Sequence, residues 1–350
     1  MVSEIRQLSS LFDPQDVDRL LDLLAIPQNI VITTHRNPDG DAMGSSLGWA
    51  KVLEGLGHNV VVVIPNAFDR YLSWLPGSQE VIDATGDPNG AQKAISRADV
   101  IFCLDFGAFK RLGDLADLVI PAPAPKIMID HHIDPEDFGH LRFHVQGISS
   151  TAELVYRLAL QMGLSQLIDQ DAAECIYVGL MTDTGSFRFN TTTAAVHRIA
   201  AALIEKGIDV GRIHNLVFDN FTEQRNRFLG YLLYKKMVVL PEYRTAYMTI
   251  SMQEGLDFGI GAGDTEGFVN YNLSLRGINF GVLLRESHEG TRLSFRSIGS
   301  FPCNEFAAHF NGGGHHNASG GKVDHDLAST EAKFLELLPS FKHLLEYESR

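Results

Sequence analysis

The stretch KIMIDHHID, residues 126–134, joins an apolar run directly to an acid and two histidines. Its first residues have the unbroken apolar character of a strand that is covered on both faces of a sheet. Asp130, His131 and His132 follow at once, and each of these side chains can bind a proton or a metal ion. The stretch therefore predicts a buried parallel strand whose carboxyl end carries chemically active groups.

Three further runs share this apolar pattern, namely NIVITT at 29–34, VVVVIP at 60–65 and VIFCLD at 100–105. Helical patterns lie between the runs, at 42–56 and 89–97, and more helices are expected at 149–162, 169–182 and 191–206. Strands that alternate with helices are typical of a doubly wound α/β domain with a parallel sheet. This is the fold class that we predict for the N-terminal part of the chain.

The C-terminal part has a different pattern. From Met237 onward β-rich runs return, and a final helix is expected at 328–346. This pattern predicts a second, smaller α/β domain. We expect an N-terminal domain at 1–206, a linker at 207–221 and the second domain at 222–350.

Composition limits the classes of function. The chain has 350 residues and a net charge of −14, which disfavours binding to long duplex nucleic acid through its phosphates. Three scattered cysteines do not suggest a disulfide framework, so a reducing cytoplasm is expected. Acids interrupt the apolar positions of the first 24 residues, which argues against a signal peptide or a membrane span.

The segment TTHRNPDGDAMGSS, residues 33–46, follows the first predicted strand. It places His35, Asp39 and Asp41 between the end of a strand and the start of a helix. In open α/β sheets, ligands bind beyond the carboxyl ends of the strands. The alternative is that these acids only cap the helix and build the turn, as Asp often does beside Gly and Pro.

Other strand and helix ends carry similar groups. VIFCLDFG places Asp105 at the end of its strand, and LMTDTGSF places Asp183 at the end of a mostly apolar helix. A carboxylate at a helix C-terminus opposes the helix dipole, so Asp183 needs a positive partner. A metal ion would supply one. We therefore expect these groups to meet at one edge of the sheet.

In this order, the motifs resemble those of the DHH phosphoesterases, a superfamily of RecJ-like exonucleases, exopolyphosphatases, family II pyrophosphatases and small oligoribonucleases. The matching segments are HRNPDGD at 35–41, Asp105, the triplet at 130–132 and Asp183. The resemblance implies a centre of two Mn²⁺ ions, with Mg²⁺ as the alternative. It implies these ligands: His35, Asp39 and Asp105 for one ion, and Asp41, Asp105, His131 and Asp183 for the other.

The resemblance also implies roles at the reacting phosphate. Asp105 would be a catalytic residue because it bridges the ions, His132 would face the phosphate, and Asp130 would orient a ligand. Oxygen and imidazole donors without thiolate suit manganese or magnesium. Four carboxylates balance two divalent cations, which would hold a hydroxide for attack on phosphorus.

A second motif, FNGGGHHNASGG at 310–321, resembles the GGGH motif of the DHHA1 domain, the C-terminal partner of many DHH enzymes. Successive glycines let backbone amides point at an anion, although a flexible connection is the simpler alternative. The segments LLRES at 283–287 and LSFRS at 293–297 also fit that domain. The resemblance implies these substrate-binding residues: Arg285, Arg296, Ser297, Gly313, Gly314, His315 and Ser319. It leaves the role of His316 open.

The pairing of the two motif sets most resembles the nanoRNase/pAp phosphatase group. It implies a cytoplasmic enzyme that cleaves short RNA oligonucleotides to mononucleotides and 3′-phosphoadenosine 5′-phosphate (pAp) to AMP. Alternatives are a phosphodiesterase for linear pApA or pGpG, a family II pyrophosphatase or exopolyphosphatase, and a nucleotide-binding module without catalysis. A homodimer is expected only from base rates. Substrate length and the direction of degradation stay open.

Overall fold

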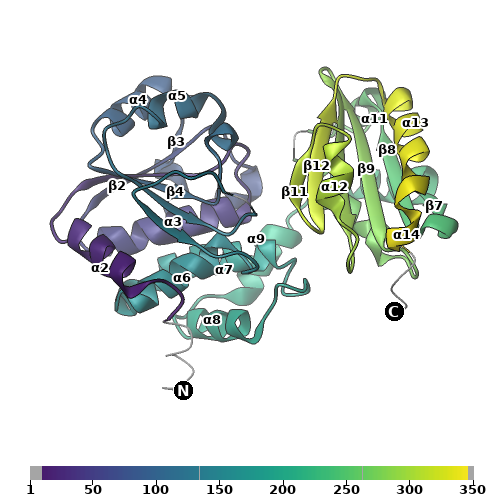
Figure 1. The fold of residues 1–350 in the computed structure, drawn as a ribbon. Helices are drawn as coiled ribbons and strands as arrows, with labels where there is room; N and C mark the ends of the chain where they lie inside the picture. Colours follow the sequence, from purple (N-terminus) through teal and green to yellow (C-terminus); the bar gives the residue numbers. More distant parts are fainter. Residues whose placement is uncertain (1–9, 134, 262, 346–350) are drawn as a thin grey trace. The chain divides into compact units, whose positions relative to one another are not determined.

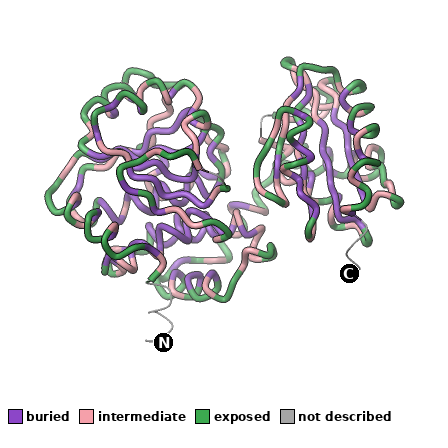
Figure 2. Tube along the Cα trace, in the orientation of Figure 1, coloured by how far each residue is buried: buried purple, intermediate pink, exposed green. Residues whose placement is uncertain are grey.

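The chain divides into two compact units, Met1–Asn220 and Phe221–Arg350 (Figure 1). A computed structural model describes residues 10–133, 135–261 and 263–345. The first nine residues of the N-terminal segment considered above lie outside this description. In each unit the strands form the buried centre, and the loops and outer helix faces are exposed (Figure 2).

The first unit contains a six-stranded sheet. Its strands are β1 (Asn29–Thr33), β2 (Asn59–Ile64), β3 (Ile82–Asp83), β4 (Val100–Leu104), β5 (Lys126–Asp130) and β6 (Leu141–His144). Their order is β3-β2-β1-β4-β5-β6, and every neighbouring pair is parallel. The predicted doubly wound parallel sheet is confirmed. The strand order reverses between β1 and β4, which makes this the topological switch point.

Helices cover both faces of this sheet (Figure 1). They are α2 (Pro14–Leu23), α3 (Gly40–Gly55), α4 (Pro88–Ser96), α5 (Ala116–Val119), α6 (Thr151–Gln161), α7 (Gln170–Asp183), α8 (Ala194–Ile204) and α9 (Val210–Phe218), with 3-10 turns η1 (Arg70–Leu72), η2 (Ser78–Glu80), η3 (Phe109–Leu115) and η4 (Ser165–Leu167). Ile30 and Ile32 of β1 pack into one core with α3, α6 and α7, whereas Val31 packs into another with α4, η3 and α5. Both faces are apolar, which explains the unbroken apolar runs.

Glycines let α3 and α7 approach closely. A Cβ added to Gly44 would lie 2.5 Å from the carbonyl oxygen of Cys175, and one added to Gly179 would lie 2.9 Å from Oδ1 of Asp41. These two positions therefore have no room for a side chain. The close packing brings the start of α3 beside α7, which ends in Asp183.

The segment expected as a linker at 207–221 contains α9. Ile213 and Val217 of this helix are buried in the core of the first unit. Their burial explains why the structural boundary lies at the end of that segment, between Asn220 and Phe221. The apolar spacing of Ile213 and Val217, four residues apart, is one that a single helix face produces.

The second unit also has a six-stranded sheet. Its strands are β7 (Val238–Leu240), β8 (Thr245–Ile250), β9 (Phe280–Ser287), β10 (Gly290–Ser297), β11 (Gly313–His315) and β12 (Ala318–Val323). Their order is β11-β12-β10-β9-β8-β7. Only β8 and β9 form a parallel pair among these neighbours, and the other pairs are antiparallel.

Short helices accompany this sheet. They are α10 (Glu223–Tyr231), α11 (Met252–Asp257), α12 (Cys303–Ala308), α13 (Leu327–Leu337) and α14 (Lys342–Leu345), with a π-helical turn η5 (Leu232–Lys236) and 3-10 turns η6 (Pro241–Tyr243), η7 (Phe268–Ser274) and η8 (Leu338–Phe341). The α12 and α13 helices pack on one face of the sheet, and α10 and η7 pack on the other. The predicted α/β character of this unit is confirmed.

The final helix differs from the single span expected at 328–346. It consists of α13, η8 and α14, and Pro339 lies in the 3-10 turn between the helices. Proline has no amide hydrogen to continue a helical ladder, which accounts for the interruption. Residue 346 lies outside the described residues. No helix in residues 10–133, 135–261 and 263–345 is long and apolar enough to cross a bilayer.

Candidate metal centre

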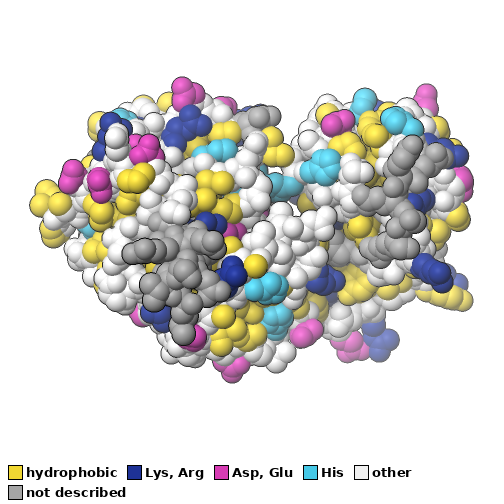
Figure 3. All heavy atoms as spheres, turned by 60° about the horizontal axis from the view of Figure 1, so that its bottom comes forward, with side chains coloured by type: hydrophobic (Ala, Val, Ile, Leu, Met, Phe, Trp, Pro, Cys, Tyr) yellow, Lys and Arg dark blue, Asp and Glu magenta, His cyan; other side chains and the backbone are white. Residues whose placement is uncertain are grey.

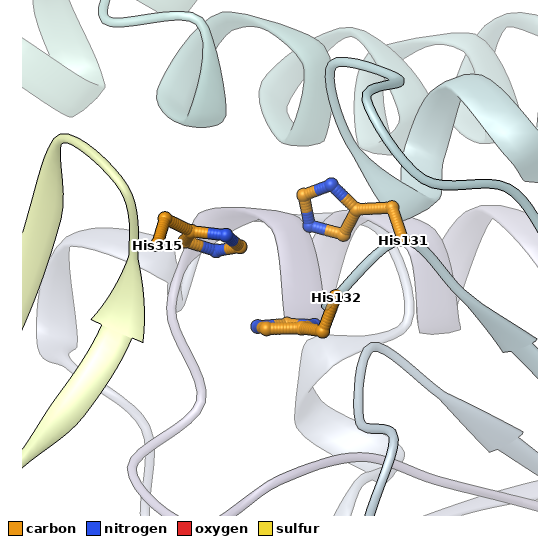
Figure 4. A group of neighbouring side chains, drawn as sticks. All are labelled: His131, His132 and His315. Atoms are coloured by element: carbon orange, nitrogen blue, oxygen red, sulfur yellow. The ribbon is translucent and has the colours of Figure 1, made fainter. Parts of the chain in front are cut away.

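Three adjacent strands of the first unit end in the predicted acids and histidines. His35 follows β1, Asp105 follows β4 directly, and Asp130 is the last residue of β5. His131 and His132 come after Asp130 (Figure 4). Because β1 and β4 flank the switch point, their carboxyl ends face the crevice where ligands bind in such sheets. The structure thus brings the strand-end groups to one place, as expected.

Two helix ends contribute the other carboxylates. Asp39 is the N-cap of α3, and its Oδ1 accepts hydrogen bonds of 3.1 Å from the amides of Asp41 and Ala42. Asp39 therefore does cap the helix, which the sequence analysis gave as the alternative to metal binding. It uses Oδ1, however, whereas Oδ2 of Asp39 lies 3.9 Å from Nε2 of His35. Asp183 is the last residue of α7.

The first group of donors consists of His35, Asp39 and Asp105. Nε2 of His35 lies 3.4 Å from Oδ2 of Asp105. Each of the three residues offers a ligand atom within 4.8 Å of the others. Asp105 has a positive φ of 63°, a conformation that costs energy for a residue with a Cβ and is often kept at functional sites.

The second group consists of Asp41, His131 and Asp183, whose ligand atoms also lie within 4.8 Å of one another. Nε2 of His131 lies 3.8 Å from Oδ2 of Asp41 and 3.4 Å from Oδ2 of Asp183. It also lies 3.5 Å from Oδ1 of Asp105. Asp105 therefore directs one carboxylate oxygen to each group, which is the arrangement that a bridging ligand requires.

Backbone contacts orient both imidazoles. Nδ1 of His35 lies 2.9 Å from the carbonyl oxygen of Arg36, and Nδ1 of His131 lies 3.3 Å from that of Ile148. A hydrogen on Nδ1 donated to these carbonyls leaves the Nε2 lone pair directed at the carboxylates. An Nε2 lone pair and a carboxylate oxygen that face each other repel unless a proton or a cation lies between them.

His132 lies beside His131 at the end of β5, with ring centroids 4.9 Å apart and planes at 66° (Figure 4). Its Nδ1 lies 2.8 Å from Oδ1 of Asp130, which is completely buried. His144 fixes the backbone here, because its Nε2 lies 2.7 Å from the carbonyl oxygen of His132. The Asp130 contact sets the orientation of the His132 ring, so Asp130 acts through His132 in this structure.

Thr151 is a functional neighbour that the sequence analysis missed. Its amide donates to Oδ2 of Asp41 at 2.7 Å, and its hydroxyl donates to Oδ1 of Asp105 at 2.9 Å. The amide of Ala152 donates to Oδ1 of Asp41 at 2.9 Å. The pattern of Ser150 followed three residues later by Glu153 is a helix-start signal that could have located this amide-rich end of α6.

The pKa values reflect crowded negative charge. Burial, with repulsion from Asp105 and Asp183, raises the pKa of Asp41 well above its usual range. Burial also raises the pKa of Asp183 to about 7, although His131 opposes the shift. Burial disfavours the charged form of Asp105 too, but contacts with His131 and His35 outweigh it and hold the pKa of Asp105 well below its usual value.

The two imidazoles respond in the opposite direction. Burial works against the charged form of His131, yet Asp105 and Asp183 outweigh it and raise the pKa of His131 well above its usual value. The pKa of His35 is raised for the same reason, with burial opposed by Asp105 and Asp39. A buried set of acceptors that attracts protons so strongly fits divalent cations, which satisfy the same charges without protonation.

The predicted substrate residues lie in the second unit, and strand register divides them between two faces of its sheet. Across the strands, Arg285 of β9 pairs with Arg292 of β10. Arg296 of β10 pairs with Gly281 of β9 on one side and with Ala318 of β12 on the other, and Ala318 pairs with His315 of β11. Alternation along β9 and β10 places these arginines opposite the face that carries Phe280 and Phe295. Arg285 also donates to Oγ1 of Thr265 at 3.0 Å, and Arg296 donates to the carbonyl oxygen of Phe295 at 2.9 Å.

Ser297 and Ser319 lie on the face against which α12 and α13 pack, and both are buried. The Ser297 hydroxyl donates to the carbonyl oxygen of Phe301, and the Ser319 hydroxyl donates to that of His315, both at 2.7 Å. The two neighbouring glycines differ in the space around them. A Cβ on Gly313 would meet no atom within 4 Å, whereas Gly314 has a φ of 138° and lies close to the carbonyl oxygen of Ala318.

A doubly wound sheet with a buried carboxylate and imidazole set at its switch point defines an α/β protein with a candidate two-cation centre. The chain belongs to the DHH family. The family model described as "DHH family, N-terminal domain" matches residues 29–180, and the DHHA1 domain model matches residues 243–345. The protein is a hydrolase that acts on phosphoester bonds.

Known proteins resemble this chain over nearly its whole length. An exopolyphosphatase-related protein from Bacteroides fragilis has a crystal structure with 41% identity and a TM-score of 0.92, over 96% of this chain and 99% of that one. The bifunctional oligoribonuclease and PAP phosphatase NrnA of Thermus thermophilus is 29% identical over 93% of this chain and 90% of its own length. The Bacillus subtilis protein of the same name is 28% identical over 87% and 92%.

Proposed function

We propose that this protein is a manganese-dependent phosphoesterase that hydrolyses short oligoribonucleotides to mononucleotides and pAp to AMP. The observation that carries the proposal is the carboxylate of Asp105, with one oxygen 3.4 Å from His35 and the other 3.5 Å from His131. The two NrnA relatives, similar over most of both chains, support the substrate class. The first unit would be the catalytic domain, and the second unit would bind substrate.

The proposed ligands follow the two donor groups. His35, Asp39 and Asp105 would hold one ion, and Asp41, Asp105, His131 and Asp183 would hold the other. Imidazole donors beside carboxylates favour manganese over calcium, which prefers oxygen alone, and magnesium is the second choice. When bound, such a pair of ions supplies an activated water and stabilises charge on the phosphoryl oxygens.

The protein's own groups would prepare the reaction in three ways. Thr151 holds the carboxylates of Asp41 and Asp105 in place through its amide and hydroxyl. Asp130 accepts the Nδ1 hydrogen of His132, which leaves Nε2 for the substrate. In the imidazolium form of His132, the Nε2 hydrogen would donate a hydrogen bond to a phosphate oxygen.

In the second unit, Arg285 and Arg296 would contact a second phosphate, because guanidinium groups bind phosphate through paired donors. Gly313, Gly314 and His315 would approach the same anion. The buried hydroxyls of Ser297 and Ser319 bond to backbone carbonyls, which supports a role in shaping that loop. Acidic and basic side chains are mixed on the face in Figure 3, a distribution that suits a short substrate better than a long strand.

A cytoplasmic location is part of the same proposal. Cys103, Cys175 and Cys303 are all free and buried. Free thiols without disulfides are typical of proteins in a reducing compartment.

Product analysis tests the proposal. The protein would be incubated with Mn²⁺ and, in parallel, pAp, pApA, a five-nucleotide RNA and pyrophosphate. We expect AMP from pAp and mononucleotides from both RNA substrates, with little phosphate from pyrophosphate. Turnover of pApA alone would identify a linear-dinucleotide phosphodiesterase. Preferred hydrolysis of pyrophosphate would contradict the proposal, and nucleotide binding without any turnover would leave only a binding module.

A further inference from the structure

A hollow of about 310 Å³ lies in the first unit, apart from the two donor groups. Residues after β2, after β3 and within η3 and α5 line it, among them Arg36, Asn66, Thr85, Asp114 and Leu118. This volume is at the lower end of the range for small-molecule sites, which suits one nucleoside-sized group. The sequence analysis assigned no role to any of these residues.

The hollow lies along the same sheet edge as the donor groups. Arg36, which lines it, directly follows the candidate ligand His35. Pro65 and Asn66 follow the carboxyl end of β2, and Ala84 and Thr85 follow that of β3. Neighbouring strands lie about 4.8 Å apart, so the ends of β2 and β3 lie within roughly 10 Å of the end of β1. That span is compatible with one nucleotide whose phosphate lies at the candidate metal centre.

Hydrogen bonds hold the walls of the hollow in place. The amide of Arg36 donates to the carbonyl oxygen of Arg111 at 2.7 Å. The amide of Asn37 donates to Oδ1 of Asn66 at 2.8 Å, and Nδ2 of Asn66 donates back to Oδ1 of Asn37 at 3.1 Å. The hydroxyl of Thr85 donates to the carbonyl oxygen of Pro65 at 3.0 Å. A site whose walls are fixed before binding needs less ordering to bind its ligand.

The lining combines an apolar floor with a charged rim. Leu112 and Leu115 are buried, and Pro88 and Leu118 extend the apolar surface. Arg36 and Asp114 are exposed and lie at the rim. Within the described ranges, the Arg36 guanidinium and the Asp114 carboxylate make no hydrogen bond or ion pair. The rim therefore offers one set of donors and one set of acceptors, with opposite charges that cancel.

We propose that this hollow binds the nucleobase of the substrate nucleotide, an inference that rests on the proposed nucleotide substrate. A base is flat and largely apolar on its faces, which suits the leucine and proline floor. Its edge carries both donors and acceptors, which suit Asp114 and Arg36, and guanidinium planes also stack on bases. Because the charges of Arg36 and Asp114 oppose each other, the rim has no net attraction for a phosphate and favours a neutral ring.

A binding experiment without turnover tests this assignment. The full-length protein would be titrated calorimetrically with adenosine, and separately with ribose, in excess chelator. The variants are Thr85→Trp, which fills the hollow from an exposed position, and Asp114→Ala, which removes a rim acceptor. Asn89→Trp and Asp117→Ala are matched controls, because both residues are exposed on the neighbouring α4 and α5 but do not line the hollow.

We expect adenosine to bind the wild-type protein and ribose not to bind. Thr85→Trp should raise the Kd of adenosine about tenfold or more, Asp114→Ala should raise it several-fold, and the controls should stay within about twofold. Circular dichroism would verify that each variant is folded. Wild-type affinity in both Thr85→Trp and Asp114→Ala, or no adenosine binding to the wild type, would overturn the proposal.

Kinetics separate this proposal from the proposed function. In Thr85→Trp, kcat/KM for pApA should fall about tenfold more than kcat/KM for p-nitrophenyl phosphate, which has no base. Equal losses on the two substrates would exclude a base site here. If the wild type binds adenosine but hydrolyses neither pApA nor pAp, the proposed function fails while the base site stands.

Discussion

At the carboxyl edge of the first unit's sheet, Asp41, Asp105 and His131 are almost completely buried, whereas the second unit's sheet carries Arg285 and Arg296 half-buried on the face against which α10 and η7 pack. The first arrangement concentrates negative charge where water is excluded, so it demands cations. The second leaves positive charge within reach of water and of a passing anion. In the proposed function, the first unit would carry out the chemistry and the second would hold a phosphate of the substrate.

The two units also differ in how their groups are fixed. Hydrogen bonds from Thr151 and Ala152 hold the carboxylates of the first unit, and the flanking strands are all parallel and buried. The second unit presents its arginines from antiparallel strands, next to glycines that accept varied backbone angles. Substitution of the donor residues in the first unit should therefore abolish turnover, and substitution of the arginines in the second unit should mainly weaken substrate binding.

Removal of metal should have the largest effect. Excess chelator should abolish hydrolysis of pApA, because no cations then remain to activate water or to stabilise charge on the phosphoryl oxygens. Mn²⁺ should restore the rate, and Ca²⁺ should restore much less, because the imidazole donors suit a transition metal. Steady-state rates after dialysis and metal addition measure this. Full activity in excess chelator would contradict the conclusion that the buried carboxylates of the first unit need cations.

Asp105→Asn should have the second largest effect, with kcat/KM for pApA reduced more than about 100-fold, a greater loss than that expected for a residue that only orients a ligand. The substitution keeps the shape but removes the charge that both donor groups share. Asp117→Asn, on the exposed side of α5, is the matched control and should behave as the wild type. A rate near that of the wild type in Asp105→Asn would remove Asp105 from the centre.

Asp130→Asn should reduce kcat by roughly 10- to 100-fold, the usual effect of losing a carboxylate that orients a histidine of the site. The side chain is completely buried and its Oδ1 lies 2.8 Å from Nδ1 of His132, so the change disturbs the orientation of that ring. Metal content, measured by atomic emission, should stay near that of the wild type. A loss of bound metal equal to the loss of kcat would instead connect Asp130 to the ions.

Arg296→Ala should have the smallest effect of the four, because it tests the second unit. We expect KM for pApA to rise about tenfold, the value of one charge-assisted hydrogen bond, with kcat little changed. Arg276→Ala, an exposed arginine outside the sheet, is the control. Unchanged kinetics in Arg296→Ala would make Arg296 a surface charge and would weaken the division of labour between the units.

Much of the first unit could be predicted from local sequence. Unbroken apolar runs predicted β1, β2, β4 and β5, because strands covered on both faces leave no polar alternation. Acids and histidines at the ends of these runs indicated where the candidate centre would form. The segment at 207–221 was expected as a linker, but it contains α9. The two apolar residues that pack α9 into the core were a weaker signal of a helix than the length and position of the segment were of a connection.

The substrate residues show a different limit. Sequence motifs grouped Arg296 with Ser297, but adjacent residues of a strand point to opposite faces of a sheet. Ser297 therefore turns toward Phe301 and the core that α12 and α13 cover, while Arg296 lies on the face against which α10 and η7 pack. Only the register of β9, β10 and β12 decides which side each takes.

The sequence by itself determined the types of donor, their places at strand and helix ends, and the alternation that produces a parallel sheet, because these properties depend on neighbouring residues. Only the tertiary structure decided which carboxylate oxygen of Asp105 faces which histidine, and that Thr151 would bond to Asp41 from 110 residues away. Such contacts arise from strand order and helix packing, which join segments that no local pattern connects.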